Sequence, residues 1–194
     1  MAASLLLPTS SKPQNPVPNP PKPRYSPTAK ITCSSLTAQS QSAKRHLLSL
    51  ISDQERGLST QKDPAKRASI IEAIDALAVL GRDTVTTGDS LSATWRLLWT
   101  TEKEQLFIVE NARLFGTQAG DVLQVIDVEN RTLNNVITFP PDGVFFVRSG
   151  IEIASAQRVN FRFESVYLDD DIRVAKDIRG DYLIVDCAPY NWKE

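Results

Sequence analysis

The densest group of side chains that could carry chemistry is a run of three aspartates near the C-terminus, formed by Asp169, Asp170 and Asp171. Carboxylate oxygens suit Ca²⁺ or Mg²⁺, but a calcium loop also needs spaced ligands and a permissive glycine, and this run has neither. Two other interpretations stay open. The run could face a ligand or partner at the mouth of a fold, or it could be a turn whose charges pair with cations such as Arg173, Arg179 or Lys176. The turn is favoured over the other two.

Nucleophiles and metal-binding side chains are sparse. His46 is the single histidine of the chain and belongs to the first of the predicted helices. A catalytic triad or a histidine-based metal site would require it in the domain core. Cys187 has no histidine nearby in sequence and is interpreted as structural. The glycines form no phosphate-binding fingerprint. We therefore expect no catalytic residues, no metal site, no cofactor and no enzymatic activity.

The N-terminal segment differs in composition from the rest of the chain. It has no acidic residue before Asp53, holds most of the prolines and is rich in serine and threonine. Such a segment cannot bury enough apolar surface to fold, and its basic, acid-free character is typical of an organelle transit peptide. We predict a disordered chloroplast transit peptide over residues 1–33, with cleavage near Cys33. A disordered cytosolic tail is the alternative.

Removal of this basic leader leaves an acidic mature chain, since the full chain already has a net charge of −1. An acidic chain argues against nucleic-acid binding and against a purely electrostatic attachment to anionic membranes. No apolar stretch is long enough to span a bilayer. Any lipid contact is therefore expected to be peripheral or inside a cavity.

Residues 34–90 are predicted to contain a linker and two amphipathic helices. The first covers 41–56, where leucines recur at helical spacing until Gly57. The second begins at Asp63 and Pro64, a good N-cap followed by a proline at the first helical position. Its apolar stripe runs to Gly81, and we interpret both stripes as surfaces that face a protein core.

From residue 91 onward the period of the apolar residues changes from helical to two, which indicates short strands. The expected strand segments are 95–101, 106–110, 121–128, 132–139, 144–148, 151–164, 172–174 and 182–184. Tight links without intervening helices favour antiparallel pairing, and a sheet of this length tends to close on itself. We predict a mainly β fold in which a lipocalin-like antiparallel β-barrel, residues 91–194, follows the two helices within one domain. The helix pair could cap one end of the barrel.

Seven apolar side chains are predicted to line the barrel interior. Trp95 and Trp99 have the same parity on one strand, and the alternation of 151–164 places a second group on one face. An eight-stranded barrel has room for one small apolar ligand, so inward aromatic residues would be core and ligand site at once. The predicted interior residues are Trp95, Trp99, Phe146, Ile151, Ile153, Phe161 and Phe163.

Three stretches in the right order resemble the plastid lipid-associated protein family, also called plastid fibrillins. They are the tryptophan-rich stretch 91–101, the amphipathic opening 47–58 and the acidic closing stretch 166–174 followed by Gly180. The similarity covers roughly residues 43–186. It implies a lipocalin-like barrel, peripheral association with thylakoids or plastoglobules in the chloroplast, and binding of small lipophiles such as quinones, carotenoids or fatty acids.

The sequence thus predicts a lipid-binding module that is not an enzyme. The alternative is a structural scaffold with the same fold, which would recruit partner proteins to plastid membranes through its acidic surface. An enzyme of lipid metabolism that uses carboxylates as acid and base is disfavoured, because no second catalytic group converges with them in sequence.

Overall fold

The computed structural model describes residues 29–115, 117–160 and 162–193. Residues 1–28, most of the predicted transit peptide, lie outside the described residues. The helix α1 (Ala29–Ile51) begins before the expected cleavage point at Cys33 and ends at Ile51, so the helix predicted over 41–56 starts too late and runs five residues too far. The division into a leader, a helical segment and a barrel remains a proposal.

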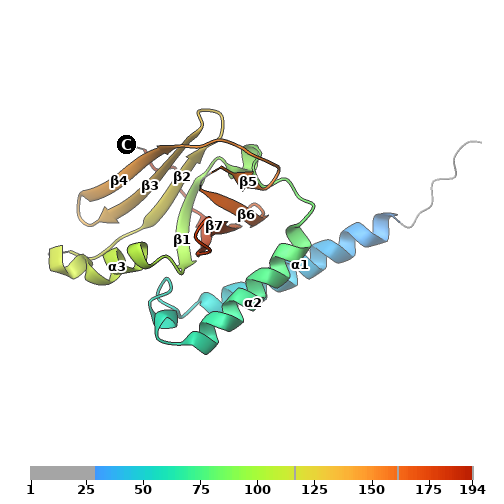
Figure 1. Cartoon of the computed structure of the whole chain (residues 1–194), viewed down its shortest axis with the longest axis horizontal. Coiled ribbons are helices and arrows are strands. Elements are labelled where there is room, and N and C mark those ends of the chain that lie inside the picture. Colours follow the sequence, from blue (N-terminus) through green and yellow to red (C-terminus); the bar gives the residue numbers. More distant parts are fainter. Residues whose placement is uncertain (1–28, 116, 161, 194) are drawn as a thin grey trace, which may run out of the picture.

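The residues that the structure describes form three α-helices and eight strands, which Figure 1 shows in their arrangement. The other helices are α2 (Pro64–Gly81) and α3 (Lys103–Asn111), with short 3₁₀ turns η1 (Ser59–Gln61), η2 (Asp89–Leu91) and η3 (Ala112–Phe115). The strands are β1 (Thr94–Thr100), β2 (Val122–Asp127), β3 (Thr132–Phe139), β4 (Gly143–Gly150), β5 (Arg158–Val159), β6 (Phe163–Leu168), β7 (Ile172–Asp177) and β8 (Tyr182–Cys187).

The eight strands form one antiparallel sheet in the order β4-β3-β2-β1-β8-β7-β6-β5. The first and last segments of the β region meet at the centre, where β1 pairs with β8. The sheet curls into a half-barrel with β4 and β5 at its two ends, and this confirms the mainly β, lipocalin-like fold. The expected closure by pairing of these end strands is not seen in the described ladders.

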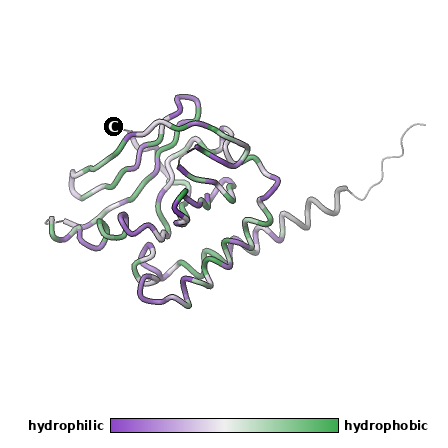
Figure 2. Tube along the Cα trace, in the orientation of Figure 1, coloured by the Kyte–Doolittle hydropathy of each residue, from purple (hydrophilic) through white to green (hydrophobic). Residues whose placement is uncertain are grey.

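The start of α2 follows the sequence prediction. The Asp63 carboxylate accepts a hydrogen bond from the Lys66 backbone N–H at 2.9 Å, and Pro64 opens the helix. Such a cap satisfies a donor that the first helical turn leaves unpaired. Hydrophobic and hydrophilic positions alternate along the α1–α2 pair (Figure 2), and the apolar stripe of α2 is buried.

The helix pair covers the convex face of the sheet. Leu47 and Ile51 of α1 and the stripe of α2 form one core cluster with outward side chains of β1, β6, β7 and β8. The sequence suggests that the helix pair caps one end of a barrel. The pair lies on the convex face instead, so this expectation is wrong. The connection to α2 returns to the end of β1, where the Thr100 backbone N–H donates to the Arg56 carbonyl.

Gly57 makes this return possible. Its φ of +113° lies in a region that side-chain-bearing residues rarely adopt, and a Cβ there would stand 2.2 Å from the Thr100 carbonyl oxygen. The glycine expected only to stop a helix thus holds the helix pair against the sheet.

Two strand predictions are wrong. Residues 106–110 lie in α3, because the four-residue apolar run 106–109 is too short for its period to separate strand from helix. The segment 151–164 is not one strand, since the chain doubles back within it: Ile153 pairs with Val159, and the Ala154 N–H donates to the Arg158 carbonyl. Its apolar alternation reflects two short arms of a turn.

Candidate functional site

The concave face of the half-barrel and the helix α3 enclose a space that we call the lumen. A second core cluster of inward side chains from β1–β3 and β5–β8 surrounds it, and Ile108 and Val109 of α3 pack against this cluster. Register pairs place Val122, Ile137 and Phe145 side by side on the inward face of β2, β3 and β4. The site is therefore built from both halves of the sheet.

The lumen contains two neighbouring hollows. The apolar hollow has a volume of about 270 Å³ and is lined mainly by valines, leucines and isoleucines with Phe145. The charged hollow has about 370 Å³ and opens between Arg162, Asp177 and Arg179. The two share a wall formed by Glu102, Glu104, Gln105, Gln124, Asn135 and Leu183. An apolar chamber behind a polar mouth is a common form of small-molecule site.

Arg173 is the most unusual side chain of the lumen. It is 0% exposed, and its guanidinium lies over the rings of Phe163, at 4.7 Å, and Trp95, at 5.8 Å. Its Nη2 donates to the Gln124 side-chain oxygen, while Nε and Nη1 have no hydrogen-bond partner among the described residues. Burial lowers the pKa of Arg173 to about 9, against the opposing influence of Glu102. The group still carries its charge at neutral pH.

Glu102 stands in the shared wall at the start of α3 and is largely buried. Burial is the main reason why its pKa is raised to about 7, and the negative charges of Asp177 and Asp181 add to the effect. The Gln105 side chain donates a hydrogen bond to it. The lumen therefore contains a carboxyl group that changes its charge near neutral pH.

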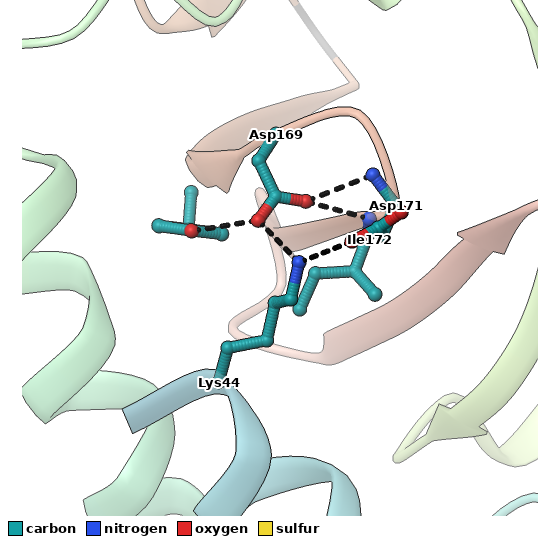
Figure 3. Close-up of polar contacts among 5 residues, drawn as sticks. Lys44, Asp169, Asp171 and Ile172 are labelled. Carbon is teal, nitrogen blue, oxygen red and sulfur yellow. Dashed lines mark hydrogen bonds and ion pairs between the residues drawn. The ribbon is translucent and has the colours of Figure 1, made fainter. Parts of the chain in front are cut away.

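The aspartate run lies outside the lumen, in the β6–β7 turn (Figure 3). Asp169 accepts hydrogen bonds from the backbone N–H groups of Asp171 and Ile172 and from the Tyr167 hydroxyl. Lys44 of α1 reaches both Asp169, at 2.7 Å, and Asp171, at 2.6 Å. The run is therefore a turn with paired charges, as the favoured interpretation expects. Its cation, however, is Lys44 from a distant helix and not Arg173, Arg179 or Lys176.

Electrostatics at this turn favour the charged forms. Burial works to lower the pKa of Lys44, but hydrogen bonds to Asp169 and Asp171 outweigh it and raise the pKa. Burial works to raise the pKa of Asp169, but Lys44 and two backbone N–H groups keep it low. Asp170 is exposed. The turn is a structural clasp between α1 and the sheet.

Three of the predicted interior residues face the lumen. Phe163 lines the charged hollow, and Trp95 and Ile151 belong to the surrounding core. Trp95 also donates from its indole to the Leu91 carbonyl at 2.9 Å, which fixes the ring beneath Arg173. Whether any of them binds a ligand remains a prediction.

Three others lie elsewhere. Trp99 belongs to the helix-facing cluster and donates to Thr60, because an irregularity in register between Leu97 and Trp99 reverses the parity of β1. Phe146 points away from the lumen and contacts the ring of Trp192 at 5.8 Å. Ile153 is 39% exposed at the β5 edge. Phe161 lies outside the described residues.

The sequence analysis does not predict the polar side chains that lie in the lumen. Gln124 alternates with the apolar Val122 and Ile126, and Arg173 lies within the apolar run of β7. Such polar interruptions at inward positions are the signal that could have found them. The sequence alone offered Arg173 only as a partner for the adjacent aspartates, whereas its side chain points to the opposite face of the sheet.

The described part of the chain contains no cluster of histidine, cysteine and acidic side chains that could hold a metal ion. Within the same part, no helix is long and apolar enough to cross a bilayer. His46 is exposed on α1, on the helix-covered side of the sheet, and Cys187 is exposed as well.

A curled antiparallel half-barrel with an internal hollow defines a lipocalin-like protein. The PAP_fibrillin family model matches residues 41–166. A protein of Arabidopsis thaliana named "Probable plastid-lipid-associated protein 11, chloroplastic" is 64% identical over 187 residues, which cover 85% of this chain and 88% of that protein. No solved structure gives a significant match. The chain belongs to the plastid lipid-associated protein (fibrillin) family, and it is a chloroplast protein.

Proposed function

We propose that the chain binds one small lipophilic molecule in its lumen and associates peripherally with thylakoids or plastoglobules, without catalysing a reaction. The observation that carries the proposal is the apolar hollow beside the charged hollow, together in the volume range of small-molecule sites. Burial of apolar ligand surface supplies about 25 cal/mol per Å². Quinones, carotenoids and fatty acids are the classes considered, and membership of a lipid-associated family supports them.

Exposed apolar side chains near the lumen give the proposed lipid contact a location. Phe107 of α3 is 63% exposed and Leu114 of η3 is 79% exposed. An apolar groove of about 530 Å³ between Ile108 and Phe145 lies beside the apolar hollow, which shares these two residues. A lipophile could pass along this groove from a lipid surface into the lumen.

Two neighbouring valines of β4 test the proposal. Val147 lines the apolar hollow, whereas Val144 belongs to the opposite face of the strand, and they are 48% and 50% exposed. We expect Val147→Trp to fill the hollow and weaken lipophile binding by about tenfold or more, and Val144→Trp to leave binding unchanged. Titration of the full chain with plastid lipid fractions, followed by mass spectrometry of retained molecules, measures this. Retention of no lipophile by the unmodified chain would contradict the proposal.

A scaffold that recruits partner proteins is the second candidate. It is favoured by β4, which ends the sheet with Val144, Phe145, Phe146 and Val147 all exposed. A free strand edge can pair with a strand of another protein. In that case Val144→Trp and Val147→Trp would impair function equally, because both alter the same edge.

A further inference from the structure

Most of the buried polar atoms that lack a partner lie on the lumen side of the fold. Among the described residues these are Nε and Nη1 of Arg173, the Ser165 hydroxyl and the Gln105 side-chain oxygen, whereas the remaining one, Asn134 Oδ1, lies on the opposite face of β3. Gln105 lines both hollows, and Ser165 pairs in register with Ala175, which lines the charged hollow. An isolated buried polar group is costly, so such a concentration points to an occupant that provides the missing partners.

Arg173 dominates this set because it is charged. Among the described residues, Gln124 is its one hydrogen-bond acceptor, and no carboxylate lies within ion-pair distance of it. A buried guanidinium with no carboxylate in contact destabilises a fold, and Glu102 attracts it without forming an ion pair, so an apolar side chain would serve the fold better. The fold does not explain this arginine.

The guanidinium is nevertheless held in a fixed place. Stacking against Phe163 and Trp95 and the bond to Gln124 orient its plane. Gln124 and Phe163 both line the charged hollow, so one layer of side chains separates Arg173 from the open space. A displacement of the Gln124 amide would bring an incoming group to the unused N–H donors.

A guanidinium fork matches the two oxygens of a carboxylate, and also those of a phosphate. The charges that line the charged hollow favour a carboxylate over a phosphate. They are four acidic side chains and two arginines: Glu102, Glu104, Asp177, Asp181, Arg162 and Arg179. A doubly charged phosphate would be repelled there, whereas a carboxylic acid can enter in its neutral form, release its proton to solvent and bind Arg173 as the carboxylate.

We propose that Arg173 is the head-group receptor of the lumen and that the ligand is a long-chain monocarboxylic acid, with its carboxylate at Arg173 and its chain in the apolar hollow. This inference rests on the proposed function and narrows it to one chemical class. It makes a neutral quinone or a carotenoid a weaker ligand than an acid of similar size.

The experiment compares a long-chain fatty acid with its methyl ester, which has the same chain and no charge. Full-length, delipidated protein is titrated with each by isothermal calorimetry. We expect the acid to bind about tenfold to a hundredfold more tightly than the ester. We expect Arg173→Met to abolish that difference while the ester binds as before, which also shows that the lumen is intact. Arg45→Met removes an exposed arginine of α1 that lines neither hollow, and it should retain the preference.

The outcomes separate the two proposals. Equal affinity for acid and ester in the unmodified chain, or an equal loss of both in Arg173→Met, overturns the role of Arg173 and leaves lipophile binding standing. A preference for a quinone over the acid does the same. Failure of acid, ester and quinone to bind overturns both.

Discussion

The two faces of the sheet treat buried charge in opposite ways. On the helix-covered face, Lys44 is 6% exposed and has two carboxylate partners, Asp169 and Asp171. On the lumen face, Arg173 is fully buried and has one neutral acceptor. A paired charge serves the stability of the fold, whereas an unpaired one reduces it and is retained for another reason. The comparison supports a structural role for the ion pairs on the convex side and the proposed ligand site on the concave side.

Removal of Lys44 should have the largest effect. We expect Lys44→Met to lower the free energy of unfolding by about 3 kcal/mol or more, because Asp169 would keep its buried position without its cation. Urea denaturation measures the change. Lys62, an exposed lysine beside α2, provides the control, and its replacement by Met should change stability by less than about 0.5 kcal/mol. If the two substitutions changed the free energy of unfolding equally, the ion pairs of Lys44 would not have the structural role assigned to them.

Removal of Arg173 should act in the opposite direction. In ligand-free protein we expect Arg173→Met to leave stability unchanged or raise it by about 1–3 kcal/mol, since an apolar side chain of similar length replaces an uncompensated charge. The same denaturation assay applies. A loss as large as that of Lys44→Met would show that Arg173 is part of the structural framework, and the contrast between the faces would fail.

The pH dependence of stability sharpens the contrast further. Glu102 has its pKa raised by burial to about 7, so its stabilising contribution is complete below the unfolded value near 4.5 and is lost as pH rises through 7. Between pH 5 and pH 8 the unmodified chain should lose about 2 kcal/mol more than Glu102→Gln.

Asp169 provides the matched case on the other face. Its pKa is lowered, so its contribution is present above the unfolded value near 3.8 and is lost as pH falls through the folded one. Asp169→Asn should therefore alter the acid limb of the stability profile and Glu102→Gln the neutral limb. Denaturation midpoints across pH 3–8 measure both, and a reversed assignment would contradict the account.

Much of the fold was predictable because local signals agreed with tertiary structure. Asp63 and Pro64 fixed the start of α2, and the turns around 129–131 and 177–180 fixed two hairpins. Two strand predictions are wrong. The apolar pattern of 106–110 is too short to distinguish a strand from a helix, and the chain doubles back within 151–164. The order of the strands, with β1 beside β8, depends on long-range pairing that no local pattern encodes.

The candidate site was less predictable for a physical reason. Parity assigns faces only while register is regular, and one irregularity in β1 sent Trp99 to the helices while Trp95 stayed in the lumen. Strand parity also leaves open which set faces inward, so Phe146 was placed on the wrong side. The role of Arg173 in the lumen is not predictable from the sequence, because the adjacent aspartates make a local ion pair the simplest interpretation.

The most direct test of the central claim is a crystal structure of the full chain with a long-chain fatty acid brominated near its methyl end. The account predicts the carboxylate within hydrogen-bonding distance of Arg173 Nε or Nη1, and the anomalous bromine signal among the apolar side chains around Val122 and Val147. An empty lumen, or a bromine signal only on the outer surface, would contradict it.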